Sequence, residues 1–321
     1  MTSNASRLEP RQTEDGSFSL FSHQFGEGFH SGRGALAEAR QKFVAPAELE
    51  RWSPGDTVRV LDVCFGTGCN TAALLEAAQQ RGLRLEWWGL ELDPEPLDLA
   101  LSHGGFQQQW QPTSLAILEQ LRLKGGASQP TESSWSDAAL GHGTLLWGDA
   151  RQRLSELQER QRGCLDLVLM DAFSPSRSPQ LWSVEFLSGL GSLLAPRGRL
   201  LTYCSAAAVR QALRLAGLEI ASIAASSGLR KQKHDWSGGT AASPSSLDGA
   251  ALLRALSPME EEHLRTNAAE PYRDPTHRGE RSVILRERQK AQQQAMQAGL
   301  VEATSSWRRR WGLGKESDNH Q

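Results

Sequence analysis

The sequence predicts an α/β protein built on a doubly wound, mostly parallel β-sheet, and three observations lead to this class. The run Val58–Asn70, VRVLDVCFGTGCN, has the pattern of a buried strand, a tight glycine turn and the start of a helix. Strand-like and helix-like patterns then alternate up to residue 225. Acidic residues stand at or just after four of the expected strand ends, where sheets of this kind bind ligands.

Composition places the chain among ordinary soluble proteins, with 39% hydrophobic and 22% charged residues in 321. No apolar run approaches ~18 residues and the N-terminus lacks an apolar signal core, so we expect a cytoplasmic protein without a membrane span. The four cysteines have no C-x-x-C spacing, which favours reduced thiols over a metal site. A net charge of −2 means that a nucleic-acid partner would have to bind a local basic patch.

The N-terminal segments of the chain are expected to differ in how well ordered they are. Residues 1–17 are polar and predict a disordered lead-in. The stretch Phe18–Phe43 mixes aromatic residues with glycines and becomes helical over Ala35–Lys42. Glu38 lies on that helix, where a solvent-facing role and a role at a substrate are equally consistent with the sequence.

The glycine turn after the first long strand is the most informative motif. Asp62 closes the strand, and Gly66 and Gly68 allow a ligand to approach the backbone, with Asn70 opening the helix. The third glycine of G-x-G-x-x-G is absent, so the turn fits a dinucleotide pyrophosphate poorly. The turn resembles the first motif of S-adenosylmethionine-dependent methyltransferases, although a plain α/β turn without a ligand has the same local pattern.

Two further acids follow the next strands toward one edge of the sheet. The strand Leu85–Leu92 carries Glu91 about 20 residues beyond the glycine turn, where a carboxylate accepts the ribose hydroxyls of a nucleoside. The strand Thr144–Trp147 is followed by Asp149, which is placed to meet an adenine amino group. Between them we expect a helix over Ser114–Leu123 and a surface loop over Gly125–Gly143.

The strand Leu165–Met170 is continuously apolar after Asp166 and is expected to be central. It leads into Asp171-Ala172-Phe173-Ser174-Pro175, in which a carboxylate and backbone carbonyls can accept the hydrogens of an amine. Pro175 stiffens this loop, and Phe173 offers a wall or a stacking face for a base. The same pattern is consistent with Asp171 as a cap of the next turn and Phe173 as a core residue.

The rest of the chain completes the sheet and adds an extension. The expected elements are a helix at Pro179–Leu194, a strand at Arg199–Cys204, a helix from Ser205 to Ala216, a strand at Leu218–Ala225 and a short strand near Gly239–Ser243. Residues 251–321 are expected to be helical or partly disordered. In Trp307-Arg308-Arg309-Arg310-Trp311 the tryptophans can stack on RNA bases, but at a spacing of four they more commonly pack on one helix face.

Together these stretches resemble the methyltransferase domain of the MnmC family, bacterial enzymes that modify the wobble uridine of tRNA. The similarity covers about residues 18–239, and residues 18–250 are expected to form the methyltransferase domain. The FAD-dependent oxidase half of the bifunctional members has no counterpart in these residues, as in stand-alone members of the family. The motifs that carry the resemblance are His30-Ser31, Gly34–Arg40, Phe65–Asn70, Glu91, Gly148-Asp149, Asp171–Pro175, Pro179–Trp182 and Tyr203–Arg210.

The resemblance implies methyl transfer from S-adenosylmethionine to the exocyclic amine of 5-aminomethyl(-2-thio)uridine at the tRNA wobble position. It implies no metal and no membrane partner. The implied catalytic residues are Asp171 and Phe173, and those for the cofactor are Asp62, Gly66, Gly68, Asn70, Glu91 and Asp149. The residues expected to face the substrate or RNA are Glu38, Arg177, Arg210, Arg230, Lys231 and Lys233.

Three alternatives remain at this point. The same fold could methylate a small amine or a protein, or could transfer an aminopropyl group, because aminopropyltransferases share it and also end a strand in an acid. A binding module that holds the cofactor without catalysis is the third possibility, and the presence of all four strand-end acids argues against it.

Overall fold

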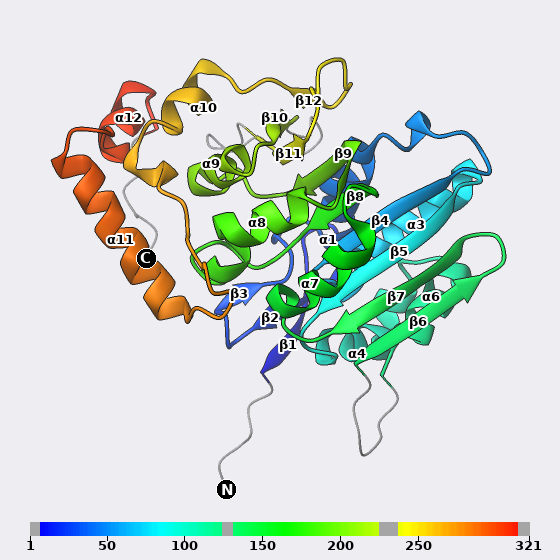
Figure 1. The fold of residues 1–321 in the computed structure, drawn as a ribbon. Coiled ribbons are helices and arrows are strands. Elements are labelled where there is room, and N and C mark those ends of the chain that lie inside the picture. Colours follow the sequence, from blue (N-terminus) through cyan, green and yellow to red (C-terminus); the bar gives the residue numbers. More distant parts are fainter. Residues whose placement is uncertain (1–6, 124–130, 225–236, 314–321) are drawn as a thin grey trace, which may run out of the picture.

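The structure is a computed structural model of the chain, and it describes residues 7–123, 131–224 and 237–313. A nine-stranded sheet runs through the molecule with helices on both faces (Figure 1). Its central strands are parallel, and the strands at both edges are antiparallel, so the predicted doubly wound class is confirmed. Across the sheet the order is β12 (Leu253–Arg254), β10 (Glu219–Ile223), β11 (Gly239–Ser243), β9 (Leu194–Thr202), β8 (Leu165–Met170), β4 (Thr57–Val63), β5 (Arg84–Glu91), β7 (Gly141–Trp147) and β6 (Glu132–Asp137).

The strand order reverses between β4 and β8. From β4 the chain adds β5 and β7 on one side, and then crosses back to place β8 and β9 on the other. The pairing of Val63 with Met170 aligns the carboxyl ends of these two central strands. The segments that follow them, which begin at Cys64 and Asp171, therefore leave the sheet side by side and open a crevice at its edge.

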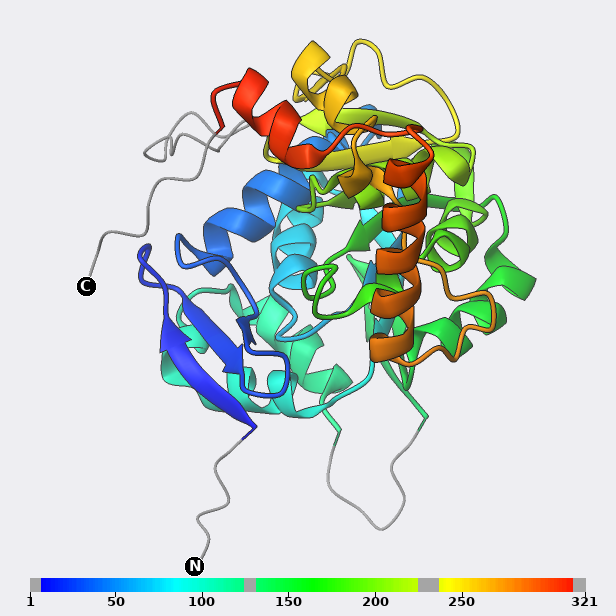
Figure 2. The same ribbon diagram turned by 90° about the vertical axis from the view of Figure 1, so that its left-hand side faces the viewer.

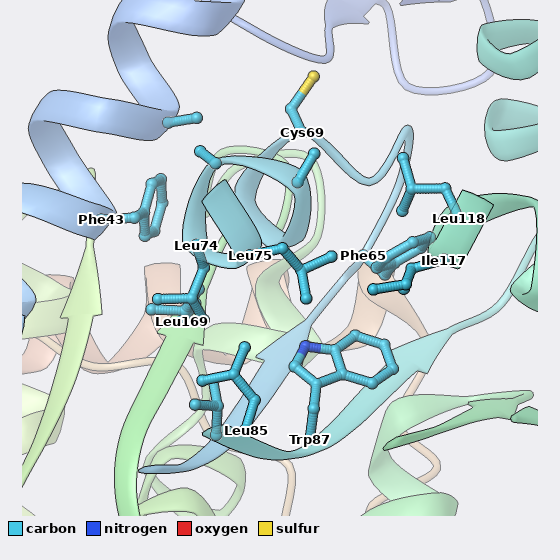
Figure 3. Packing of buried hydrophobic residues seen from close by; sticks show 14 of the residues in the cluster. Phe43, Phe65, Cys69, Leu74, Leu75, Leu85, Trp87, Ile117, Leu118 and Leu169 are labelled. Atoms are coloured by element: carbon cyan, nitrogen blue, oxygen red, sulfur yellow. The ribbon is translucent and has the colours of Figure 1, made fainter. Parts of the chain in front are cut away.

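Alternating side chains of the sheet build two cores, one on each face. In β4, Val58 and Val60 pack with the first core, whereas Leu61 and Val63 pack with the second. Figure 3 shows the first core, in which Trp87 and Phe65 lie beneath the start of α3. The helices between the strands are α3 (Cys69–Arg81), α4 (Glu95–Ser102), α5 (Gly104–Gln107), α6 (Pro112–Leu121), α7 (Ala150–Gln161), α8 (Val184–Gly191) and α9 (Ala207–Leu215), with a 3-10 turn, η3, at Pro179–Trp182.

The N-terminal segment forms a small sheet of its own, so the prediction of a disordered lead-in over 1–17 is wrong for the residues described. Leu8 is 5% exposed and pairs with Ser22 across two antiparallel strands. The side chain of Ser17 accepts the N–H of Ala35, which connects this sheet to the first helix. The elements are β1 (Leu8–Gln12), β2 (Phe18–Ser22), β3 (Glu27–Gly28), α1 (Ala35–Glu38), a π-helical turn η1 (Ala39–Val44), α2 (Ala45–Ala47) and η2 (Leu49–Arg51).

The C-terminal extension packs along one side of the molecule (Figure 2). It contains α10 (Pro258–His263), η4 (Asn267–Ala269), α11 (Arg281–Gln297) and α12 (Thr304–Arg310). Tyr272 and Ile284 of this segment belong to the second core. Trp307 is 2% exposed and stacks on His263 at 4.1 Å, so it is not available to stack on RNA. The Trp311 indole donates to Glu262.

The central sheet contains two strands that the sequence did not predict. β6 lies inside the stretch predicted as a surface loop, and it pairs with β7 from Glu132 to Asp137. β12 lies in the segment expected to be helical or partly disordered, and it pairs with β10. None of the helices in the described ranges has both the length and the apolar character needed to cross a membrane.

Candidate active site

A cavity of about 1160 Å³ opens at the carboxyl ends of the central strands. A single small ligand usually occupies about 300–1,000 Å³, so this volume has room for a nucleoside cofactor and part of a second molecule. Several of the sequence-predicted residues line it together although they come from distant parts of the chain. They are Glu38, Gly66, Asn70, Glu91, Asp149, Asp171 and Phe173.

The glycine turn after β4 forms the floor of the cavity. Gly66 and Gly68 adopt φ angles of 58° and 83°, a region that side chains strongly disfavour. A Cβ atom at Gly68 would lie 2.9 Å from side-chain atoms of both Leu118 and Phe65. The turn can therefore keep this shape only with glycine at position 68.

Asp62 lies beneath this turn and not on the cavity surface. Its side chain is fully buried, and one oxygen accepts the Thr71 hydroxyl at 2.7 Å. Burial raises the pKa of Asp62 to about 7, because the charged form loses its hydration. The residue was predicted to bind the cofactor directly, but its position below the turn fits a brace between β4 and α3.

Glu91 holds the other side of the floor. Its carboxylate accepts the N–H of Gly66 at 2.7 Å, and also the N–H groups of Leu92 and Asp93. Burial raises the pKa of Glu91, and the three N–H groups oppose that effect. This carboxylate therefore fixes the glycine turn while it also lines the cavity.

Asp149 caps the first turn of α7 by accepting the N–H of Arg151 at 2.9 Å. The guanidinium of Arg151 also pairs with this carboxylate at 2.7 Å. The other guanidinium nitrogen pairs with Asp274 at 2.8 Å, and Asp274 belongs to the C-terminal extension. A segment that sequence analysis could not interpret thus contacts the edge of the cavity.

Asp171 lines the cavity beside the start of α3. It accepts the side-chain N–H of Asn70 at 2.7 Å. Burial raises the pKa of Asp171 to about 8, and the nearby negative charge of Glu38 adds to the shift. A carboxyl with such a pKa can exchange a proton near neutral pH.

Glu38 is buried beside Asp171, and its neighbours stabilise the ionised form of its carboxyl. Burial opposes its charge, but the ion pair with Lys42 and the N–H of Ser31 hold the pKa of Glu38 below its usual value. Lys42 also lies 5.7 Å from the ring centre of Tyr203, whose hydroxyl donates to the carbonyl of Ala172. Lys42 was missed, although its spacing of four from Glu38 on an expected helix is the signal for such a pair.

An aromatic wall stands beside Asp171. Phe173 stacks on Phe25 with ring centres 4.4 Å apart and meets the edge of Phe29 at 5.1 Å. Its backbone carbonyl accepts the Trp182 indole and the Ser178 hydroxyl, both at 2.7 Å. The loop after β8 is therefore held from both sides. Phe25 and Phe29 were missed because sequence alone does not show that β2 and β3 fold over this edge.

The lining of the cavity is rich in acids. Its basic residues are Arg7, Lys42 and His30, and burial lowers the pKa of His30. This lining favours cationic ligands over anionic ones. The carboxylates that line it are Glu27, Glu38, Glu91, Asp93, Glu95, Asp98, Asp149 and Asp171. In the described part of the chain, no group of three or more His, Cys, Asp or Glu side chains is placed to hold a metal ion.

The residues predicted to face RNA have different positions. Arg177 is exposed on the loop after β8. Arg210 is 1% exposed and pairs with Glu260 at 2.9 Å, so its assignment to an RNA surface is wrong. The charge of an arginine is visible in the sequence, but its buried partner lies in a helix 50 residues further along. Arg230, Lys231 and Lys233 lie outside the described residues.

Comparison with known proteins agrees with this geometry. Residues 133–234 match a family described as S-adenosyl-L-methionine-dependent methyltransferase. Two similar proteins are both named tRNA 5-methylaminomethyl-2-thiouridine biosynthesis bifunctional protein MnmC. The one from Azoarcus sp. is 33% identical over 64% of this chain and 32% of its own. The one from Caulobacter vibrioides is 32% identical over 72% of this chain and 40% of its own.

The chain therefore spans about a third of the length of the curated relatives it matches. A solved structure is similar over a larger share of both chains. The crystal structure of MNMC2 from Aquifex aeolicus is 27% identical, with a TM-score of 0.69, and the similarity covers 89% of this chain and 85% of that one. The fold, the cavity at its switch point and these similarities identify the chain as an S-adenosyl-L-methionine-dependent methyltransferase related to the MnmC proteins.

Proposed function

We propose that this enzyme methylates the exocyclic amine of 5-aminomethyl(-2-thio)uridine at the wobble position of tRNA, giving the 5-methylaminomethyl base. The observation that carries the proposal is the single cavity in which the glycine turn and Glu91 face Asp171 and the aromatic wall. The names of the MnmC relatives support the choice of substrate. The acid-rich lining supports it as well, because both the sulfonium donor and an aminomethyl group carry positive charge.

Four residues are proposed to hold the cofactor. The backbone at Gly66 and the side chain of Asn70 would face its amino-acid part, Glu91 its ribose hydroxyls and Asp149 its adenine amino group, whereas Gly68, which does not line the cavity, would allow the turn its shape. Asp62 would act indirectly, by keeping α3 and the glycine turn in register through Thr71. When bound, S-adenosylmethionine supplies the methyl group and leaves as the neutral thioether.

Asp171 is proposed as the residue that prepares the amine. An aminomethyl group enters largely as an ammonium ion, and it must lose a proton before its lone pair can form the new N–C bond. The Asp171 carboxylate can take that proton, since its pKa is about 8, and release it to water after the C–S bond has broken. Asn70 donates to Asp171 and thereby fixes the direction in which this carboxylate points.

Phe173 is proposed to receive the base. Its ring already takes part in an aromatic cluster with Phe25 and Phe29, so a flipped uracil ring has a flat, rigid surface to lie against. The bond from Trp182 to the Phe173 carbonyl holds this surface in place when the base enters. Together with Asp171 it would set the distance between the amine and the methyl donor.

The test is methyl-labelled cofactor with tRNA that carries the 5-aminomethyl group, followed by nucleoside analysis of the digested RNA. We expect label in the 5-methylaminomethyl nucleoside and none in tRNA that lacks the amine. Asp171→Asn should bind the cofactor normally in calorimetry and lower the single-turnover rate by about 10²-fold or more, the size expected for loss of a general base.

The same assay separates the alternatives. Label in small amines or in protein, with none in the modified tRNA, would replace the RNA substrate by another amine. Turnover of a polyamine with decarboxylated cofactor would indicate aminopropyl transfer, which the acid-rich lining also suits. An unchanged single-turnover rate in Asp171→Asn would move Asp171 from catalysis to structure.

A further inference from the structure

The segment Asp274–Arg281 of the C-terminal extension is fixed at the edge of the cavity. Asp274 is 2% exposed and pairs with Arg151 at 2.8 Å. The carbonyl of Gly279 accepts a second bond from the Arg151 guanidinium at 3.1 Å, and the Gly279 N–H donates to Asp274 at 2.8 Å. The segment is thereby attached to the first turn of α7, directly behind Asp149.

The same segment also reaches the loop that follows β8. The guanidinium of Arg281 donates twice to the carbonyl of Ser176, at 3.1 and 3.2 Å. Ser176 lies five residues after Asp171 in the sequence, in the loop that carries Phe173. The extension therefore bridges the two parts of the cavity edge that carry Asp149 and Asp171.

Three exposed arginines lie on the two segments that this bridge joins: Arg177 in the loop after β8, and Arg278 and Arg281 in the extension. We call them the rim cluster. Within the ranges that the structure describes, no carboxylate lies within ion-pair distance of any of the three. Other arginines near the cavity are neutralised, such as Arg7 by Asp93 and Glu95. Within those ranges the guanidinium groups of Arg177 and Arg278 are thus available to an anionic partner, and that of Arg281, which also donates to the Ser176 carbonyl, keeps a charge that no carboxylate neutralises.

We infer that the rim cluster binds backbone phosphates of the RNA whose target nucleotide enters the cavity. This inference rests on the proposed function. The acid-rich lining repels a polyanion, and the net charge of −2 supplies no general attraction, so RNA needs local cations at the cavity edge. Guanidinium groups suit this role because they pair with phosphate through two parallel hydrogen bonds.

The arrangement also separates the two parts of the substrate by charge. Phosphates would remain on the rim cluster outside, whereas the cationic aminomethyl base would enter between carboxylates. A polyanionic backbone that carries a cationic base matches both parts of this arrangement, so the combination of a basic edge and an acidic interior favours the RNA.

The test uses the double variant Arg177→Ala/Arg278→Ala. Neither guanidinium makes a hydrogen bond within the described ranges, so the fold should be unaffected. The matched control is Arg160→Ala/Arg162→Ala, which removes the same charge from exposed positions at the far end of α7. Binding of tRNA is measured at several salt concentrations, beside calorimetry with the cofactor and single-turnover rates at saturating tRNA.

For the rim variant we expect tRNA affinity to fall by about tenfold at low salt. The slope of log K against log salt should become shallower by about 1.4–1.8, because two fewer phosphate contacts release fewer counterions. The control should keep the parent's slope, and cofactor affinity should be the same in all three proteins. Arg281→Ala should weaken RNA binding and also lower turnover, since Arg281 additionally holds Ser176.

Equal affinities and slopes in the rim and control variants would overturn the inference. A tRNA affinity that falls equally at every salt concentration, with an unchanged slope of log K against log salt, would overturn it too, because contacts to phosphate must depend on salt. If the parent binds tRNA through the rim cluster yet methylates none, the proposed reaction fails and the inference stands. If the parent binds no tRNA at any salt concentration, both fail.

Discussion

The burial of Asp171 has opposite consequences for the stability of the fold and for the proposed reaction. Its burial makes the ionised form costly, and Glu38 beside it increases that cost. The same burial brings its pKa to about 8, which suits proton exchange with an amine. The role proposed for Asp171 therefore has a cost in stability, and this cost can be measured separately from turnover.

The stability of Asp171→Asn should exceed that of the parent by an amount that grows with pH. In the unfolded chain the pKa of an aspartate is about 3.9, so between that value and about 8 the folded parent binds the extra proton. Its free energy of unfolding must then fall as pH rises through this window. The asparagine has no such proton, and its amide oxygen can still accept from Asn70.

Urea unfolding at pH 5, 6.5 and 8, without cofactor, measures this difference. The free energy of unfolding of Asp171→Asn should exceed that of the parent by more at each higher pH, and this difference should become constant above about pH 8. Glu185→Gln is a suitable control, because backbone and Arg273 hydrogen bonds that outweigh burial hold the pKa of Glu185 below its usual value. A constant difference between Asp171→Asn and the parent at all three pH values would contradict the assignment of a raised pKa.

At the scale of elements, the contact between α9 and α10 is a buried ionic network. Glu260 is 1% exposed and accepts from Arg210 at 2.9 Å and from Arg254. Arg210 also donates to the Thr240 hydroxyl at 3.0 Å, which connects the network to β11. The extension is thereby attached to the central sheet.

Glu260→Ala should destabilise the protein by about 3–5 kcal/mol, because it leaves Arg210 buried without its carboxylate. The double variant Arg210→Met/Glu260→Leu should recover most of this loss, since it removes both buried charges and keeps the volume apolar. Urea unfolding of Arg210→Met, Glu260→Leu and the double variant provides a double-mutant cycle for this pair. A loss in the double variant equal to the sum of the two single losses would show that the pair does not interact.

The elements predicted correctly from sequence are those with strong internal patterns. β8 and the second half of β4 are buried on both faces and are mostly apolar, whereas β5 alternates between buried and partly exposed residues. β6 was missed because Trp135 is its single buried residue, in a surrounding of serines and acids typical of a loop. β1 was missed for the same reason, since only Leu8 of its five residues is buried.

The residues of the candidate site likewise divide into those that a local sequence pattern predicts and those that only the fold brings together. Glu91, Asp149 and Asp171 could be predicted because each lies at or just after the end of a recognisable strand, and topology then brings strand ends together. Phe25 and the contact of Asp274 with Arg151 depend on long-range packing that no local pattern records, whereas the pair of Lys42 with Glu38 has a local signal in its spacing of four. Arg210 was wrongly assigned to an RNA-facing surface, because its charge is visible in the sequence whereas its buried ion pair with Glu260 is not.

At the scale of the whole molecule, the segment after residue 250 is part of the folded unit and not an appendage. It supplies β12 to the sheet, Tyr272 and Ile284 to the second core, and the carboxylates that pair with Arg151 and Arg210. Removing it would expose apolar surface and leave two inward-facing arginines without those partners.

Deletion of residues 251–321 should therefore abolish cooperative unfolding and soluble expression. A shorter deletion that removes only residues 314–321 serves as the control, and it should leave the unfolding transition of the parent unchanged. Circular dichroism and urea unfolding provide the measurement. A soluble, cooperatively unfolding chain that ends at residue 250 would show that the methyltransferase domain is complete without the extension.

The acid-rich lining of the cavity has a consequence for the order of events in each catalytic cycle. Methyl transfer turns the sulfonium into an uncharged thioether, so the attraction between the carboxylates and the sulfur disappears at the moment of reaction. The spent donor is therefore held less tightly than the fresh one. Electrostatics alone then makes exchange of the used cofactor easier, and the chemical step itself prepares the enzyme for its next turnover.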